Sequence, residues 1–265
     1  MKNGVEVAGE RGLARILRGS GRMLVAYSGG VDSAYLLWRS YQEVGDRVLG
    51  VLADSPSLAR SERAEAIEFA ADHRLPLRVI GTEEMENPAY RANPPNRCFF
   101  CKAELFARME RLAAVEGFDT LAYGENADDV AAERPGSGAA RAFAVRAPLR
   151  EAGLGKVAVR QLAAAAGLRV AEKVASPCLA SRIPHGQEVT VEKLARVEAA
   201  EAWVRARGFA VVRVRHDGKI ARLQVAPAEV DRLCQEEAEV RAAVLALGFE
   251  GVEIDRNGYR GAGLR

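Results

Sequence analysis

A serine- and glycine-rich hexapeptide near the start of the chain has the residue types and the neighbours of a phosphate-binding loop. It runs over Ser28–Ser33, directly after the apolar run Met23–Tyr27 and directly before the helical pattern Val31–Val44. A strand, a glycine turn and a helix start in this order aim several backbone N–H groups at one point, where the helix dipole adds its positive end. The spacing therefore predicts an anion site in front of a strand.

Within this hexapeptide, all but one of the residue types suit a phosphate chain. Gly29 and Gly30 have no side chain to block a close phosphate, and Ser28 and Ser33 carry hydroxyl donors. Asp32 is the exception, because a carboxylate repels phosphates unless Mg²⁺ lies between them, so we expect Asp32 to be a catalytic Mg²⁺ ligand. The segment is neither a Walker A loop nor a Gly-x-Gly-x-x-Gly dinucleotide fingerprint. A glycine turn that only caps a helix is the structural alternative.

Three of the four cysteines lie where they could do chemistry. Cys98 and Cys101 form Cys-Phe-Phe-Cys at an expected helix start, where the helix dipole stabilises thiolates, and Cys178 lies in the irregular segment Ser176–Gln187. Cys234 falls on the apolar side of an expected helix, so we interpret it as a small buried side chain.

The cysteine pattern leaves three interpretations open. A thioredoxin-like redox pair is disfavoured because Cys98 and Cys101 do not follow the first strand of a βαβ unit. A zinc site needs four ligands, and the sequence offers no second Cys-x-x-Cys and no nearby histidine. Three cysteines gathered at one point can hold three irons of a [4Fe–4S] cluster and leave the fourth iron open, which is the interpretation we favour.

The bulk composition restricts partners and compartment. The chain has 265 residues, with 38 Lys and Arg against 36 Asp and Glu, so it lacks the basic excess of a wide nucleic-acid surface. It contains no apolar run long enough for a membrane helix, and its first twenty residues lack the apolar core of a secretory signal. We therefore expect a cytoplasmic protein that uses neither membrane nor nucleic acid as a partner, with reduced cysteines.

Alternating short apolar runs and helical patterns in the first half predict the element that must position the loop. The expected strands are Met23–Tyr27, Arg47–Ala53, Leu77–Ile80 and Thr120–Tyr123, and the expected helices between them are Val31–Val44, Arg60–Asp72 and Cys98–Glu116. Short apolar strands separated by helices are typical of a parallel sheet covered on both faces. The fold class is therefore α/β with a doubly wound parallel sheet.

A change of pattern after Gln187 predicts a second, smaller domain. We expect helices over Val191–Arg207 and Pro227–Leu247, and strands over Phe209–Arg215, Ile220–Val225 and Gly251–Ile254, with a hairpin turn at His216–Lys219. This order predicts an α+β domain over 188–265, after a first domain over 1–187. Helix Lys156–Ala166 and three irregular stretches, over 87–96, 133–140 and 176–187, complete the first domain.

The hexapeptide Ser28–Ser33 resembles the PP-loop of the N-type ATP pyrophosphatases, which include GMP and NAD synthetases and tRNA thiolases. The resemblance implies cleavage of ATP to AMP and pyrophosphate through an adenylylated substrate. It also implies that Ala53 and Asp54, at the end of the second strand, and Gly124 and Asn126, at the end of the fourth, line the nucleoside pocket. Asp128 and Asp129 resemble the acidic pair of that family, and we assign an ATP-side role to Asp129; a helix N-terminus is the alternative.

Longer segments resemble the LarE-type sulfur transferases, which mature the nickel-pincer cofactor of lactate racemase, from about residue 20 to the C-terminus. These segments are Asn96–Lys102, Arg134–Gly136, Ser176–Pro184, Val212–His216 and Gly258–Arg260. The resemblance implies ATP-dependent conversion of a carboxylate of pyridinium-3,5-biscarboxylic acid mononucleotide to a thiocarboxylate. It implies two possible sulfur sources: sacrifice of Cys178, or sulfide on a [4Fe–4S] cluster held by Cys98, Cys101 and Cys178. We favour the cluster because all three cysteines are present.

The remaining expectations concern the substrate and the assembly. Arg182, Arg213 and Arg215 are candidates for the phosphate and second carboxylate of the substrate, since guanidinium groups pair with both; a solvated strand face is the alternative. The resemblance implies a trimer or hexamer. A PP-loop tRNA thiolase and a non-catalytic nucleotide or iron–sulfur sensor are the rival functions.

Overall fold

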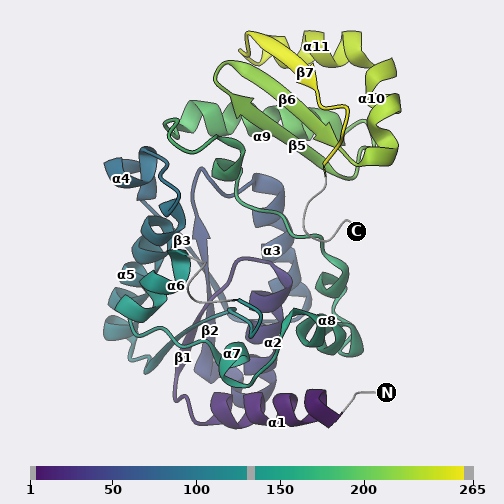
Figure 1. The fold of residues 1–265 in the computed structure, drawn as a ribbon. Coiled ribbons are helices and arrows are strands. Elements are labelled where there is room, and N and C mark those ends of the chain that lie inside the picture. Colours follow the sequence, from purple (N-terminus) through teal and green to yellow (C-terminus); the bar gives the residue numbers. More distant parts are fainter. Residues whose placement is uncertain (1–3, 130–134, 260–265) are drawn as a thin grey trace. The chain divides into compact units, whose positions relative to one another are not determined.

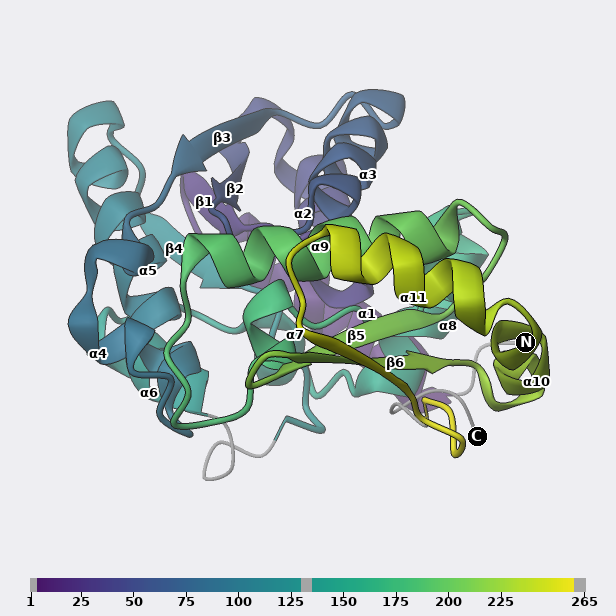
Figure 2. The same ribbon diagram turned by 90° about the horizontal axis from the view of Figure 1, so that it is seen from above.

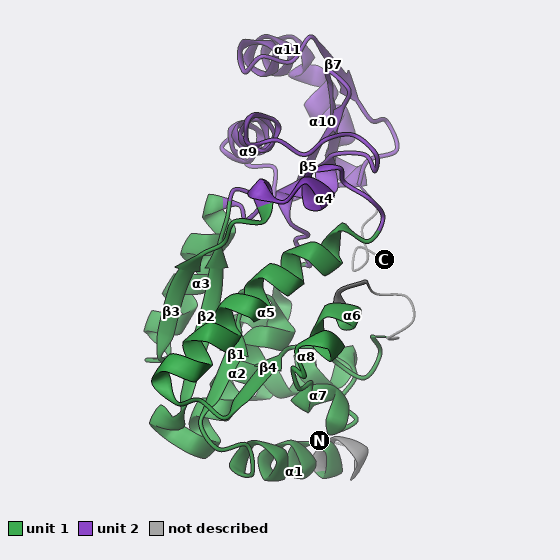
Figure 3. Cartoon of the chain, turned by 90° about the vertical axis from the view of Figure 1, so that its left-hand side faces the viewer, with its two compact units in different colours: residues 1–55, 60–84, 96–174 green, residues 56–59, 85–95, 175–265 purple. Residues whose placement is uncertain are grey.

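The computed structural model describes residues 4–129 and 135–259, and they form two groups that make most of their contacts internally. Unit 1 comprises residues 1–55, 60–84 and 96–174, and unit 2 comprises 56–59, 85–95 and 175–265 (Figure 3). Residues 175–187 therefore group with the C-terminal part. The predicted domain boundary at residue 187 stays a prediction, because mutual contact does not show which piece folds alone.

Unit 1 contains the predicted parallel sheet, which confirms the α/β class. Its strands are β1 (Met23–Ala26), β2 (Val48–Asp54), β3 (Leu77–Gly81) and β4 (Thr120–Tyr123), hydrogen-bonded in the order β3-β2-β1-β4. Met23 is in register with Val48 on one side and Thr120 on the other. Helices α2 (Val31–Val44) and α3 (Arg60–Asp72) connect β1 to β2 and β2 to β3, whereas α5 (Arg97–Glu116) precedes β4.

This strand order positions the hexapeptide. From β1 the chain moves one way to β2 and β3, and then returns across the sheet to β4 on the other side of β1. Because such crossovers are right-handed, α2 and α3 cover one face and α5 covers the other, as Figure 1 shows. The carboxyl ends of β1 and β4 therefore meet at a topological switch point, the usual place for a ligand in an open α/β sheet.

A hydrophobic core under α5 holds this edge in place. Phe106 and Met109 of α5 are fully buried against Leu24 of β1 and Tyr123 of β4. The rings of Phe106 and Tyr123 meet edge to face at 5.8 Å. The burial of such large apolar side chains stabilises the sheet edge from which the loop after β4 departs.

The rest of unit 1 contains the predicted helix at Lys156, here α8, together with helices that the sequence pattern did not predict. The further elements of this region are α1 (Gly4–Arg18), η1 (Gly45–Arg47), α6 (Pro135–Ala142), α7 (Pro148–Glu151), α8 (Lys156–Ala165) and η3 (Arg169–Glu172), and η2 (Glu84–Glu86) spans the boundary to unit 2. The stretch 133–140, expected to be irregular, is helical from Pro135 and packs on α5. Arg134 and Arg260, both within the segments of the family resemblance, lie outside the described residues.

Unit 2 contains the predicted small sheet, with β5 (Val212–Asp217) antiparallel to β6 (Ile220–Val225) and β7 (Gly251–Ile254) parallel to β6. Helices α9 (Val191–Arg205) and α11 (Glu237–Ala246) lie side by side against this sheet (Figure 2). The expected single helix Pro227–Leu247 is instead η5 (Pro227–Glu229), α10 (Val230–Gln235) and α11. Two short helices, α4 (Pro88–Arg91) and η4 (Leu179–Arg182), interrupt stretches expected to be irregular. No helix within residues 4–129 and 135–259 is both long and apolar enough to cross a bilayer.

Candidate functional site

The hexapeptide forms the turn between β1 and α2. Gly29 has a φ of +73°, and a Cβ there would lie 2.8 Å from the Cβ of Ala66 on α3, so a side chain is excluded twice. Gly30 is the N-cap of α2, and no side chain caps it. The first N–H groups of α2 have no acceptor earlier in the helix, as at every helix start. They are available to an anion.

Hydrogen bonds between the two serines close this turn. The backbone N–H of Ser28 donates to Oγ of Ser33 (3.1 Å), and the two hydroxyl oxygens are 3.0 Å apart. The Ser33 hydroxyl also donates to the carbonyl of Gly30 (3.1 Å). The hydroxyls predicted to bind phosphate therefore also shape the loop, and their phosphate-binding role stays a prediction.

The segment after β4 lies directly against the hexapeptide. A Cβ on Gly124 would lie 2.6 Å from the backbone nitrogen of Ser33, a contact that only glycine avoids. Asn126 is buried, and its Nδ2 lies 3.4 Å from Oδ2 of Asp32. The structure therefore brings two predicted ATP-binding segments, separated by about ninety residues, to one place, as the switch point requires.

Asp32 lies at the centre of a group of polar side chains that we call the loop cluster: Asp32, Asn126, Asp128 and Lys156. Oδ2 of Asp32 accepts a hydrogen bond from Nζ of Lys156 at 2.6 Å. Oδ1 is shielded from solvent and has no hydrogen-bond partner within the described part of the chain. A shielded carboxylate oxygen without a donor is one that a cation can satisfy, so Asp32 fits the predicted Mg²⁺.

The acidic pair after β4 has structural contacts. Oδ2 of Asp128 accepts the backbone N–H of Lys156 at the start of α8 (2.6 Å). Oδ2 of Asp129 accepts the backbone N–H of Asn126 (3.2 Å). Both carboxylates therefore stabilise the conformation of the loop after β4, which resembles the alternative role of an acidic pair at a helix N-terminus. An ATP-side role for Asp129 stays a prediction.

At the end of β2, Asp54 is tied to α3. Arg60 (2.6 Å) and Arg63 (2.8 Å) both form ion pairs with its carboxylate. Burial alone would raise the pKa of Asp54, but the hydrogen bonds and charges of the two arginines outweigh burial and hold that pKa below its usual value. Ala53 and Asp54 both remain half-buried, and their contact with a nucleoside stays a prediction.

Glu125 is a site residue for which the sequence offered no signal. It is the buried neighbour of Asn126 in the chain, Arg150 forms an ion pair with it (2.5 Å), and Ser137 donates a hydrogen bond to it. Burial and the neighbouring Glu125 raise the pKa of Tyr123. The contacts of Glu125 with Arg150 and Ser137 therefore hold the chain in place just after the end of β4.

The cysteines are all free thiols, and they are divided between the units. Cys98 is exposed and Cys101 half-buried at the start of α5 in unit 1, and Cys178 is exposed just before η4 in unit 2. Within either unit, the described residues include no group of three or more Cys, His, Asp or Glu side chains that could hold a metal ion. Cys234 is half-buried rather than buried, and its Sγ accepts a hydrogen bond from Arg256 (2.9 Å).

One of the three predicted substrate arginines, Arg182, lies in a second group, the Glu201 cluster, formed by Arg182, Glu201 and Arg205. Arg182 and Glu201 are only 4% and 1% exposed, and both carboxylate oxygens of Glu201 accept from Arg182, at 2.8 and 3.1 Å. Arg205 adds a second ion pair to Glu201 (2.8 Å), and the backbone N–H of Val214 donates to it (3.1 Å). Arg182 also donates to the carbonyl oxygens of Pro177 and Cys178.

The other two predicted arginines, Arg213 and Arg215, lie on one face of β5, as their alternation predicts. Arg213 donates to the carbonyl (2.9 Å) and hydroxyl (3.1 Å) of Ser181, and its Nε is buried without a partner among the described residues. Burial, followed by the charge of Arg182, lowers the pKa of Arg213. Arg215 is half-buried and donates to Gln224 (3.0 Å). Substrate contact by any of the three stays a prediction, and Arg182 has the fewest donors left for it.

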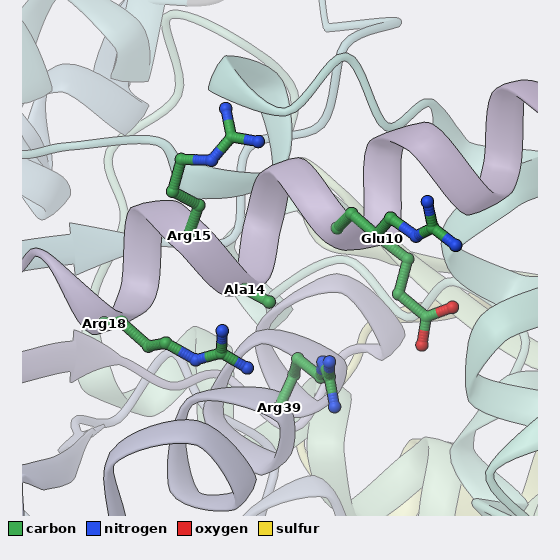
Figure 4. A pocket seen from close by; sticks show the side chains of 6 residues that line it. Glu10, Ala14, Arg15, Arg18 and Arg39 are labelled. Carbon is green, nitrogen blue, oxygen red and sulfur yellow. The ribbon is translucent and has the colours of Figure 1, made fainter.

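A cavity between α1 and α2 is lined by no residue of the loop cluster. It has a volume of about 450 Å³ and is lined by α1 and α2 through Glu10, Arg11, Ala14, Arg15, Arg18 and Arg39 (Figure 4). Glu43 forms ion pairs with both Arg18 (2.7 Å) and Arg39 (2.6 Å). The basic residues in the last turn of α1 also interact favourably with the negative end of that helix's dipole. None of the residues that line this cavity belongs to the hexapeptide or to the segments predicted to bind ATP.

Comparison with known proteins places the chain in a family. No family model matches it. An uncharacterized protein of Synechocystis is 39% identical over 90% of each chain. The pyridinium-3,5-bisthiocarboxylic acid mononucleotide synthase of Lactiplantibacillus plantarum is 32% identical over 94% of this chain and 90% of its own. Cytoplasmic tRNA 2-thiolation protein 1 of Drosophila grimshawi is 29% identical, but over only 44% of this chain. The chain therefore belongs to the LarE-like family of PP-loop ATP pyrophosphatases, to which that synthase belongs.

Proposed function

We propose that this protein is an ATP-dependent sulfur transferase that converts a carboxylate of pyridinium-3,5-biscarboxylic acid mononucleotide to a thiocarboxylate during nickel-pincer cofactor synthesis. The observation that carries the proposal is 32% identity to the bisthiocarboxylic acid mononucleotide synthase over nearly the whole chain. The loop cluster supports it independently, because an open helix start suits the phosphates of ATP and a half-paired aspartate suits the Mg²⁺ that accompanies them.

In this proposal the hexapeptide binds the phosphate chain of ATP. The free N–H groups at the start of α2 donate to phosphate oxygens, and Gly29 and Gly30 let the phosphates approach the backbone. Asp32 would hold Mg²⁺ through its unpartnered Oδ1, and the ion would neutralise part of the phosphate charge. Ala53, Asp54, Gly124 and Asn126 would face the nucleoside.

Adenylylation explains why ATP is consumed. A carboxylate oxygen of the substrate attacks the α-phosphorus, the bond from that phosphorus to the bridging oxygen breaks, and pyrophosphate leaves with the electron pair. The product is an acyl-adenylate, in which AMP replaces oxide as the group to be displaced. A sulfur nucleophile then attacks the acyl carbon, and AMP leaves with the oxygen that came from the carboxylate.

For the sulfur source we propose the three-cysteine route. Cys98 and Cys178 are exposed free thiols and Cys101 is partly exposed, a donor set that suits an iron–sulfur cluster. When bound by three thiolates, a [4Fe–4S] cluster leaves one iron open to an external sulfur ligand. Sacrifice of Cys178, which would leave dehydroalanine, is the competing route.

We further propose that Arg213 and Arg215 bind the phosphate and second carboxylate of the substrate, and that the protein assembles as a trimer or hexamer, as the resemblance implies. Guanidinium groups bind both anions through paired hydrogen bonds. The unpartnered Nε of Arg213 is a donor available for this purpose. Arg182 serves in this proposal to hold the backbone of Cys178.

Product analysis tests the function. Incubation with ATP, Mg²⁺, a sulfur source and the biscarboxylic acid mononucleotide should yield AMP, pyrophosphate and a thiocarboxylate detectable by mass spectrometry. Formation of ADP and phosphate would refute the proposal. Retention of bulk tRNA on a filter, with thiolation of that tRNA, would instead favour the tRNA thiolase alternative.

Cysteine variants test the sulfur source under anaerobic conditions. Changing Cys98, Cys101 or Cys178 singly to Ala should abolish both the iron–sulfur absorption and the thiolation, whereas Cys234→Ala should spare both. With added sulfide, turnover should be multiple and Cys178 should keep its mass. Conversion of Cys178 to dehydroalanine with one equivalent of product and no need for iron would establish the sacrificial route.

A further inference from the structure

Lys156 brings a positive charge to the hexapeptide from a distant part of the sequence. Its Nζ lies 2.6 Å from Oδ2 of Asp32, 124 residues earlier in the chain. The hexapeptide has no lysine of its own, in contrast to a Walker A loop, whose lysine contacts the phosphates. Among the described residues, Lys156 is the cation that forms an ion pair with Asp32.

The backbone around Lys156 is held so that its side chain starts from a fixed point. Lys156 is the first residue of α8, and its N–H donates to Oδ2 of Asp128 (2.6 Å). A Cβ on Gly155 would lie 2.7 Å from both oxygens of that carboxylate, so a larger residue there would displace the carboxylate from this position. Helix α8 also packs on α2, which starts with the hexapeptide (Figure 1).

The ion pair between Lys156 and Asp32 is partly exposed to solvent. The Lys156 side chain is 38% exposed and that of Asp32 is 17% exposed, so the ammonium group can leave the carboxylate without entering an apolar environment. Lysine carries three donors on a flexible stem, and Asp32 uses one of them. An arriving phosphate chain would offer several charged acceptors to the others.

We propose that Lys156 is a catalytic residue of the adenylylation step. Its ammonium group donates to phosphate oxygens at the junction of the α- and β-phosphates. It stabilises the negative charge that grows on pyrophosphate as the bond from the α-phosphorus to the bridging oxygen breaks. The lysine keeps its proton throughout, and the electron pair of the broken bond leaves with pyrophosphate. This inference rests on the proposed function, and it assigns to Lys156 the role that a loop lysine has in Walker A proteins.

Pyrophosphate binding tests the inference without the substrate. In calorimetric titrations with pyrophosphate, Lys156→Met should weaken binding at least about tenfold, the effect of losing one charge-assisted hydrogen bond. Lys156→Gln can still donate to Asp32 but has no charge, so it should show the same loss. Lys219→Met removes an exposed lysine that pairs with Glu250 in unit 2 and should bind pyrophosphate like the wild type.

Turnover supplies the second readout. Lys156→Met should lower kcat for pyrophosphate release by about 10² to 10³, as the loss of one preorganised charge-stabilising donor does, and Lys156→Arg should recover part of it. Unchanged pyrophosphate affinity in Lys156→Gln would overturn the inference, and so would wild-type kcat in either uncharged variant. If the wild type itself releases no pyrophosphate with the proposed substrate, the proposed function fails, while the binding titrations still decide the role of Lys156.

Discussion

The loop cluster of unit 1 and the Glu201 cluster of unit 2 contain similar charged groups, but they differ in how many of their hydrogen-bonding atoms have partners. In the Glu201 cluster, the carboxylate oxygens accept from two arginines and a backbone N–H, and both Glu201 and Arg182 are almost fully buried. In the loop cluster, Asp32 keeps one shielded oxygen without a partner, and its lysine is partly in water.

This difference indicates what each cluster is for. A buried ion pair whose donors and acceptors are satisfied has nothing left for a ligand, and its removal costs folding free energy. A shielded oxygen without a donor is a local cost that a ligand can offset when it binds. We therefore assign stability to the Glu201 cluster and chemistry to the loop cluster, and the following predictions test that division.

The largest effect is expected for Asp32→Asn. This change keeps the shape of the side chain but removes the charge that the proposed Mg²⁺ site requires, so kcat should fall by about 10² to 10³. The circular dichroism spectrum should stay that of the wild type. The exposed Asp46→Asn loses the same charge outside the cluster and should keep full activity. Equal loss in both variants would show a general charge effect instead.

In the Glu201 cluster the expected effect is on folding. Glu201→Gln would leave the buried Arg182 without its counter-charge, and the free energy of unfolding should fall by about 3 kcal/mol or more. Guanidinium titration of a Trp38→Phe background, followed through Trp203 fluorescence, reports on unit 2. In the exposed pair Lys219–Glu250, Glu250→Gln should cost no more than about 1 kcal/mol. Similar losses for the two variants would contradict the structural role of Glu201.

Arg215 tests whether unit 2 also contributes to the substrate site. Arg215→Ala should raise KM for the mononucleotide about tenfold, because one charge-assisted hydrogen bond is lost, and should leave the Kd for ATP unchanged. Arg241→Ala, on α11, serves as the matched control and should alter neither constant. A parallel loss of ATP affinity in Arg215→Ala, measured by calorimetry, would place this arginine at the nucleotide instead.

The smallest effect is a pH dependence of unit 2. His216 is buried, and both ring nitrogens are without partners in the described part of the chain. Burial, followed by the charges of Lys193 and Arg196, lowers the pKa of His216. The unfolded chain therefore binds a proton more readily, and stability should be constant above about pH 6.5 and fall below it. His216→Leu should flatten this part of the denaturation profile, whereas a change at the exposed His185 should not.

The parts of the fold and of the site that could be predicted are those determined by residues close together in the sequence. The hexapeptide and the strands β4, β6 and β7 have their signals within a few residues, and α2 and α3 end where their patterns end. Helix α6 was missed because Pro135, Gly136 and Gly138 are typical of loops. Proline is favoured at a helix start, and Gly138 faces Phe99 of α5, so packing on α5 stabilises this helix.

The site residues that were missed depend on contacts between distant segments. Lys156 contacts Asp32 only because α8 packs on α2, and no local pattern distinguishes it from a surface lysine. The burial of Arg182 depends in the same way on Glu201, nineteen residues later. An arginine in an irregular segment is equally compatible with a substrate site and with an ion pair until its partner is known.

Isotope transfer tests most directly the central claim, that a substrate carboxylate attacks the α-phosphorus of ATP bound at the hexapeptide. The substrate is prepared with ¹⁸O in its carboxylates and incubated with ATP, Mg²⁺ and a sulfur source, and the nucleotide products are analysed by mass spectrometry. The account predicts that one ¹⁸O appears in AMP for each thiocarboxylate formed and that none appears in pyrophosphate. Recovery of ¹⁸O in inorganic phosphate together with ADP, or thiocarboxylate formation with unlabelled AMP, would contradict it.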